Sequence, residues 1–123
     1  MASNTYVHVA FGFLAMGAWA VFANRAHPLP QALLAGLVQG AISGTLTLFL
    51  KKFLEWFSAR LNGAMALVLP PLTTATAIAA ILVTAHMLAG TPEILATIAV
   101  PFTVSTSYAI LYNLRLWRSA HGR

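Results

Sequence analysis

The chain has 123 residues, of which 59% are hydrophobic and only 7% are charged, and its net charge is +5. This composition excludes a water-soluble globular protein and predicts an integral membrane protein, whose outer surface faces lipid. The absence of cysteine excludes disulfide bonds, thiolate catalysis and cysteine-ligated zinc or iron–sulfur sites. Basic residues flank apolar segments instead of forming a separate basic face, so no nucleic-acid partner is expected.

Four apolar segments account for most of the sequence. Each is near the length of about 20 residues that a helix needs to cross the hydrocarbon core of a bilayer. The expected spans are residues 7–23, 32–50, 64–88 and 93–116. We therefore predict an all-α, polytopic membrane protein with four transmembrane helices in a compact bundle, forming a single domain over residues 1–123.

The first span is expected to be retained as a helix instead of being removed as a signal peptide. No Lys or Arg precedes it, and its apolar run is longer than the hydrophobic region of an ordinary signal peptide. The loop that follows it and the loop before the fourth span hold most of the non-basic polar side chains. The candidate residues of this external mouth are Asn24, His27, His86 and Glu93.

His86 and Glu93 have two interpretations. They could share a proton or hold a cation, or they could be ordinary interfacial residues in water, with Glu93 favourably placed at a helix N-terminus. Two candidate ligands do not make a recognisable metal signature, so no metal site is expected.

The second span carries glycines at intervals of four, at Gly36, Gly40 and Gly44. Such a stripe lets another helix backbone approach closely and gain van der Waals contact that lipid cannot supply. The partner is either a neighbouring helix of the same chain or a second copy. Gln39 and Ser43 lie on an adjoining face, where Gln39 either hydrogen-bonds another helix or contacts a substrate or ion.

The segment KKFLEWFSAR, residues 51–60, continues the second span as an amphipathic extension suited to the headgroup region. Basic residues here and at the end of the fourth span are expected to attract anionic phospholipid, either as ordinary anchors or as a specific lipid site. These headgroup residues are Lys51, Lys52, Arg60, Arg115 and Arg118.

The distribution of Lys and Arg predicts the topology. Together with Arg123, the headgroup residues put six of the seven Lys and Arg residues on one side of the expected membrane, and Arg25 alone lies on the other. Basic residues near the ends of spans are retained in the cytoplasm. Both termini are therefore expected to be cytoplasmic, in a bacterial inner membrane.

The fourth span contains Pro101, which has no backbone N–H and leaves the Thr97 carbonyl without its usual partner. Several hydroxyl-bearing residues follow it, so this segment is either ordinary packing or the wall of a polar cavity. If the second and fourth spans face each other, they form a neutral central polar site. Its members would be Gln39, Ser43, Thr97, Pro101 and Ser105.

The two halves of the chain resemble each other. A shift of 62 positions aligns Pro30 with Pro92 and Ser43 with Ser105, among other matches. This indicates two duplicated helix hairpins in parallel orientation, related by an axis along the membrane normal. The alternative is convergent composition, with a proline near the start of each second helix.

The sequence contains no nucleophile with a base and an orienting group, no paired carboxylates and no glycine-rich phosphate loop, so neither an enzyme nor a cofactor is expected. The repeat, the polar stripes and Pro101 favour a homo-oligomeric translocator or channel-type component for a small solute or lipid-linked substrate. The small size, the glycine stripe and the lack of buried charge favour the alternative, a non-catalytic structural or accessory subunit of a larger membrane complex.

Overall fold

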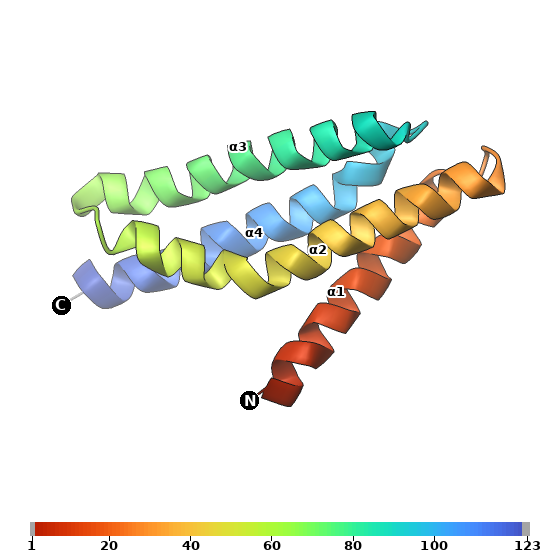
Figure 1. The fold of residues 1–123 in the computed structure, drawn as a ribbon. Helices are drawn as coiled ribbons and strands as arrows, with labels where there is room; N and C mark the ends of the chain where they lie inside the picture. Colours follow the sequence, from red (N-terminus) through yellow and green to blue (C-terminus); the bar gives the residue numbers. More distant parts are fainter. Residues whose placement is uncertain (1, 122–123) are drawn as a thin grey trace.

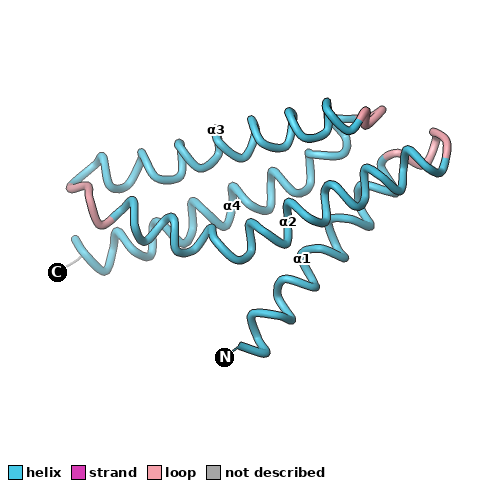
Figure 2. Tube along the Cα trace, viewed as in Figure 1, coloured by secondary structure: helices cyan, strands magenta, loops and turns pink. Residues whose placement is uncertain are grey.

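The computed structural model describes residues 2–121, and within them it contains four long helices and no strand (Figure 1). The helices are α1 (Ala2–Ala23), α2 (Leu29–Ser58), α3 (Gly63–Ala89) and α4 (Ile94–His121). Each is long and apolar enough to cross a membrane, and only short loops join them (Figure 2). The prediction of an all-α, multi-pass membrane protein is confirmed.

The helices run past the apolar segments where no residue stops them. The amphipathic extension continues α2 without a break as far as Ser58, and α4 likewise continues to His121. Where α3 ends, a helix-breaking residue is present. Gly90 follows α3 with a φ of 72°, a left-handed conformation that favours glycine, and its N–H bonds to carbonyls of the last turn.

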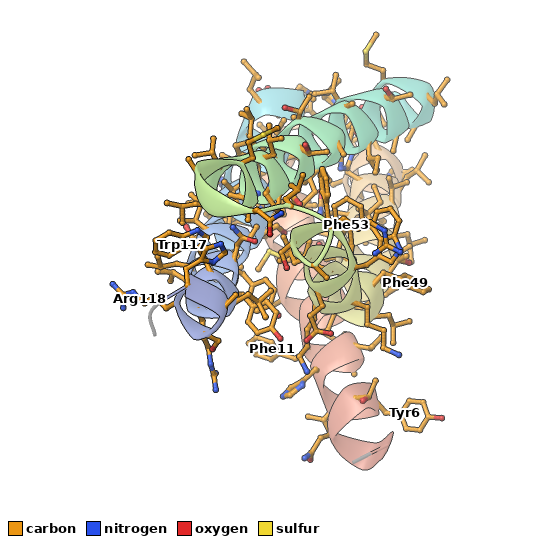
Figure 3. The ribbon with its side chains drawn as sticks, turned by 90° about the vertical axis from the view of Figure 1, so that its left-hand side faces the viewer. Tyr6, Phe11, Phe49, Phe53, Trp117 and Arg118 are labelled. Atoms are coloured by element: carbon orange, nitrogen blue, oxygen red, sulfur yellow. The ribbon has the colours of Figure 1, made fainter. Side chains whose placement is uncertain are left out.

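Helices α2, α3 and α4 lie alongside one another, whereas α1 crosses α2 at an angle and its N-terminal end diverges from the rest (Figure 1). Helix α1 contacts α2 extensively and α4 to a smaller extent, but in the described range it does not contact α3. Tyr6, near the start of α1, projects away from the other helices and is 73% exposed (Figure 3).

Glycines hold α1 directly against α2. A Cβ added at Gly40 would lie 2.9 Å from the Phe13 carbonyl oxygen, and one added at Gly17 would lie 2.9 Å from the Gly36 carbonyl oxygen. These distances are shorter than real Cβ contacts, so the two backbones meet at van der Waals distance without intervening side chains. Gly44 lies on the same seam, with Val9 of α1 as its nearest neighbour. The glycine stripe of α2 is thus covered by α1 of the same chain.

An amide side chain joins α4 to α3 at a pair of prolines. Pro70 and Pro71 lie inside α3 and have no N–H, which leaves the carbonyls of Ala66 and Leu67 without helical donors. The Nδ2 of Asn113 donates to both of these oxygens, at 3.0 Å each. Asn113 is buried, so its amide replaces donors that water could not supply there.

Candidate functional site

The two ends of the molecule differ in chemistry. The loops α1–α2 and α3–α4 lie together at one end, here called the outer end, on the right of Figure 1. The α2–α3 loop and the end of α4 lie at the other end, here called the basic end. The basic end carries the predicted headgroup residues Lys51, Lys52, Arg60, Arg115 and Arg118. Arg123 lies outside the described residues.

A buried asparagine fastens α1 to α4 at the outer end. The Nδ2 of Asn24 donates to Thr97 Oγ1 at 2.7 Å and to the Ala20 carbonyl at 2.8 Å. Its Oδ1 accepts the backbone N–H of Glu93 at 2.9 Å, one of the free donors at the start of α4. Above this cluster, His27 Nε2 and Glu93 Oε2 approach to 2.8 Å at the surface.

A buried histidine fastens α3 to α2 in a similar way. His86 Nε2 lies 2.9 Å from Gln39 Oε1, and His86 Nδ1 lies 2.7 Å from Thr91 Oγ1. Because the amide oxygen of Gln39 only accepts, the hydrogen of this bond is on His86 Nε2. The Gln39 Nε2 then donates to Ser43 Oγ at 2.9 Å. His86 and Gln39 are fully buried, and both ends of each side chain have partners.

The external mouth predicted from the sequence divides into two parts. His27 and Glu93 pair at the surface, whereas Asn24 and His86 are fully buried and join helices instead of lying in water as interfacial residues. All four residues lie near the ends of spans, so their burial depends on which helices pack around them and not on that position. In the described part of the chain, no group of three or more His, Asp or Glu side chains could hold a metal ion.

The residues of the predicted central polar site are separated into different contacts. Gln39 bonds to α3 and Thr97 bonds to α1, and no hydrogen bond joins the two among residues 2–121. Ser43, Pro101 and Ser105 come together elsewhere, in the wall of a cavity between α1, α2 and α4. The five residues were grouped on the condition that the second and fourth spans face each other, whereas the other interpretation of Gln39, a hydrogen bond to another helix, is the one that the structure shows.

This cavity has a volume of about 520 Å³ and is lined mainly by apolar side chains. Helix α1 contributes Phe11, Gly12, Met16 and His8; α2 contributes Ser43, Leu46, Thr47, Leu50 and Lys51; α4 contributes Pro101, Val104, Ser105 and Tyr108. Ser43 lies near the middle of α2, Pro101 lies in the first third of α4, and Lys51 lies towards the basic end of α2. The cavity therefore extends from the central part of the molecule towards the basic end.

The divergence of α1 accounts for the cavity. The hydrogen bonds between α1 and α4 lie near the outer end, where Trp19 Nε1 donates to the Ala96 carbonyl at 3.0 Å and Asn24 bonds to Thr97. Towards its N-terminus α1 departs from the other helices (Figure 1). The side-chain hydrogen bonds of Trp19 and Asn24 thus fix α1 to α4 near the outer end, and the cavity lies between the diverging parts.

A polar and aromatic cluster joins α2 to α4 at the basic end of the cavity. The Tyr112 hydroxyl donates to Glu55 Oε2, and Lys51 Nζ lies 3.8 Å from the same oxygen. The Tyr108 ring stacks on Tyr112, with centroids 5.5 Å apart and planes inclined by 7°. Lys51 and Tyr108 line the cavity, so this cluster forms its charged rim.

Four residues that form or support contacts between helices were not among the site residues predicted from the sequence, namely Glu55, Tyr108, Tyr112 and Asn113. Lys51 and Glu55, like Tyr108 and Tyr112, are four residues apart and so share a helix face, which was a usable signal. Asn113 was also detectable, because a strongly polar side chain inside an apolar span usually has a specific partner. The spacing did not show that the pair on α2 contacts the pair on α4.

Comparison of the chain with models of protein families, with curated proteins and with solved structures found no match. The functional interpretation therefore depends on two features of the structure itself. One is the set of buried polar contacts that join the helices at the outer end, and the other is the cavity with its charged rim at Lys51.

Proposed function

We propose that the protein is a non-catalytic translocator component that binds a small amphipathic, lipid-like molecule in the cavity between α1, α2 and α4. The observation that carries this proposal is the cavity itself, which extends from Ser43 and Pro101 to Lys51. Its volume lies within the range of about 300–1,000 Å³ that is typical of small-molecule sites. A binding site that reaches the middle of the membrane is also typical of secondary transporters.

The lining favours a lipid-linked substrate over a small polar solute. Phe11, Leu46, Leu50 and Val104 would surround an apolar chain, and a polar solute would lose its hydration among them without gaining equivalent hydrogen bonds. The polar groups of Gln39, in contrast, are occupied by His86 and Ser43. An amphipathic molecule is the ligand that suits both the apolar wall and the charged rim.

The outer-end contacts support the proposed duplication of a helix hairpin. The shift of 62 positions carries Asn24 to His86, and both are buried polar residues at the ends of α1 and α3. Asn24 bonds to α4 and His86 bonds to α2, so each joins its own hairpin to the second helix of the other. Two hairpins in parallel orientation would produce this correspondence.

We further propose that the four helices pack as a compact bundle and that several copies associate in a bacterial inner membrane, with anionic phospholipid at the basic end. One chain uses the buried side chains of Asn24, Gln39 and His86 for internal hydrogen bonds, so these groups do not form a polar route for a headgroup. Association with a second copy would supply the polar wall of such a route. The positive-inside distribution of Lys and Arg supports cytoplasmic termini.

The topology can be tested with single cysteines, because the chain has none of its own. His121→Cys should be protected from an impermeant thiol reagent added outside. Ala26→Cys should react, because Ala26 is exposed in the α1–α2 loop at the outer end. Labelling of His121→Cys in intact cells would reverse the proposed orientation.

The alternative function is a structural or accessory subunit of a larger membrane complex. It is favoured by the side chains of Asn24, Gln39 and His86, which form hydrogen bonds within the chain. The outer half is therefore held together by its own polar contacts. In that case a helix of another protein would occupy the cavity. The accessory function predicts a stable complex with that protein and no lipid movement by the isolated chain.

A pair of tryptophan substitutions on α4 tests the cavity. Val104 lines it and is 53% exposed, whereas Ile110 is 51% exposed and lies outside the lining. Val104→Trp should fill the cavity and abolish most of the movement of fluorescent phosphatidylglycerol between the leaflets of reconstituted vesicles. Ile110→Trp should retain it, because the same bulk then faces lipid. Equal rates for both variants, or no movement with the unaltered chain, would refute the translocator proposal.

A further inference from the structure

We infer that the cavity selects lipid-like molecules with an anionic headgroup, and that Lys51 is the residue that recognises this headgroup. The inference rests on the proposed function, because it presupposes that an apolar chain occupies the cavity. It adds the chemical class of the ligand and the residue that determines specificity.

The charge of the lining carries the argument. Lys51 is the basic residue on the rim, and the described residues that line the cavity include no carboxylate. The nearest carboxylate, Glu55, is outside the lining and accepts a hydrogen bond from Tyr112. A negative headgroup at this rim would meet an ammonium group, whereas the ammonium of a zwitterionic headgroup would approach a like charge.

Lys51 is available for such a ligand. Its distance of 3.8 Å to Glu55 Oε2 is at the limit of an ion pair, and the two side chains are 61% and 41% exposed. Pairs of this kind are weak in water and are easily exchanged for a better partner. A headgroup oxygen could therefore replace Glu55 as the partner of Lys51 while Glu55 keeps its bond to Tyr112.

The neighbouring aromatic residues are held in place by one another before a ligand binds. Tyr108 is held by stacking on Tyr112, whose hydroxyl is held in turn by Glu55. A rim that is already ordered loses little conformational entropy when it binds. His8, on the diverging part of α1, lines the same cavity and adds a second nitrogen-bearing side chain.

The remainder of the cavity indicates a lipid and not a free anion. Beyond the rim the wall consists largely of apolar side chains, among them Phe11, Leu46 and Val104. A free anion at Lys51 would leave this surface uncovered, whereas an attached hydrocarbon chain would bury it and gain the hydrophobic contribution. The site therefore requires both a charge and a chain.

Neighbouring lysines provide the test. The purified full chain in detergent is titrated with dioctanoyl phosphatidylglycerol and with dioctanoyl phosphatidylcholine, and bound lipid is counted by native mass spectrometry. Lys51→Gln should weaken binding of phosphatidylglycerol about fivefold, the effect of losing one basic contact to an anionic lipid, and leave phosphatidylcholine unchanged. Lys52→Gln removes the same charge from the adjacent position, which is outside the lining, and should have less than half of this effect.

Two further variants separate the possible outcomes. Glu55→Gln removes the carboxylate that competes for Lys51 and should increase the preference for phosphatidylglycerol. Equal losses in Lys51→Gln and Lys52→Gln would mean general surface attraction and would overturn the role of Lys51. If Val104→Trp leaves binding of both lipids intact, the cavity is not the binding site and the proposed function fails with it. If Val104→Trp blocks both lipids but Lys51→Gln changes neither, only the charge selectivity fails.

Discussion

The contact between α1 and α2 should respond to the smallest possible change, one methyl group at Gly40. The added Cβ would lie 2.9 Å from the Phe13 carbonyl oxygen and 3.0 Å from two atoms of the Phe13 ring. The carbonyl belongs to the backbone of α1 and cannot rotate away. Gly40→Ala must therefore push the two helices apart, whereas Gly44→Ala, on the same stripe, would meet its nearest atom, Val9 Cγ1, at an ordinary 3.4 Å.

The geometry sets the size of the effect. Restoring an ordinary contact at Gly40 requires a local separation of about 0.5 Å, which forfeits about a quarter of the dispersion energy of each contact along the seam. Overpacking of this kind costs about 1–3 kcal/mol, and the better helix propensity of alanine returns up to about 1 kcal/mol. Gly40→Ala should lower the free energy of unfolding by about 1–2 kcal/mol, and Gly44→Ala should leave it unchanged or raise it slightly.

Reversible unfolding in mixed micelles, followed by far-ultraviolet circular dichroism, measures both variants against the unaltered chain. The molar mass of the purified protein should not change with Gly40→Ala, because the stripe is covered by α1 of the same chain. Equal stability of the two variants would refute the close backbone contact. A fall in molar mass with unchanged monomer stability would instead assign the stripe to an interface between copies.

Two buried amides should also prove structural. Asn113→Leu removes the donor to the Ala66 and Leu67 carbonyls and should lower the free energy of unfolding by about 1–3 kcal/mol, the cost of leaving buried acceptors unpaired. The same unfolding assay measures it, and a change within error of zero would contradict the role. Gln39→Leu takes the acceptor from His86 and should cost about 1 kcal/mol, the scale of a hydrogen bond between membrane helices. Reconstituted vesicles with this variant should still show lipid movement. Loss of movement at unchanged stability would indicate that Gln39 contacts the substrate.

Hydropathy and helix-breaking residues were sufficient to predict the elements. Four apolar segments of near-membrane length can only be satisfied as helices, because the bilayer offers no partner for exposed backbone groups. The predicted spans accordingly match the four helices of the structure, although α2 and α4 continue further into the polar region. Gly90 stops α3 close to the predicted end of the third span, since few other residues adopt its left-handed conformation.

Contacts between residues of different helices were harder to predict from the sequence. The stripe at Gly36, Gly40 and Gly44 indicated a close helix contact but left its partner open, and the structure places α1 there. Gln39 was expected either to hydrogen-bond another helix or to contact a substrate or ion, and the structure shows a bond to His86 of α3. Which helix supplies the partner depends on the rotation of each helix about its axis, which the spacing of residues does not give.

The amino-acid sequence by itself determined the class, the number of helices and the concentration of basic residues at one end. These properties follow from local chemistry, since the cost of exposing a segment to lipid or water depends mainly on its own side chains. Only the tertiary structure decided which faces meet. Side-chain volumes around Gly17 and Gly40 set the crossing of α1 and α2, and the bonds of Asn24 fix α1 to α4 at the outer end. The cavity at Lys51 is a consequence of that crossing, and no single segment encodes it.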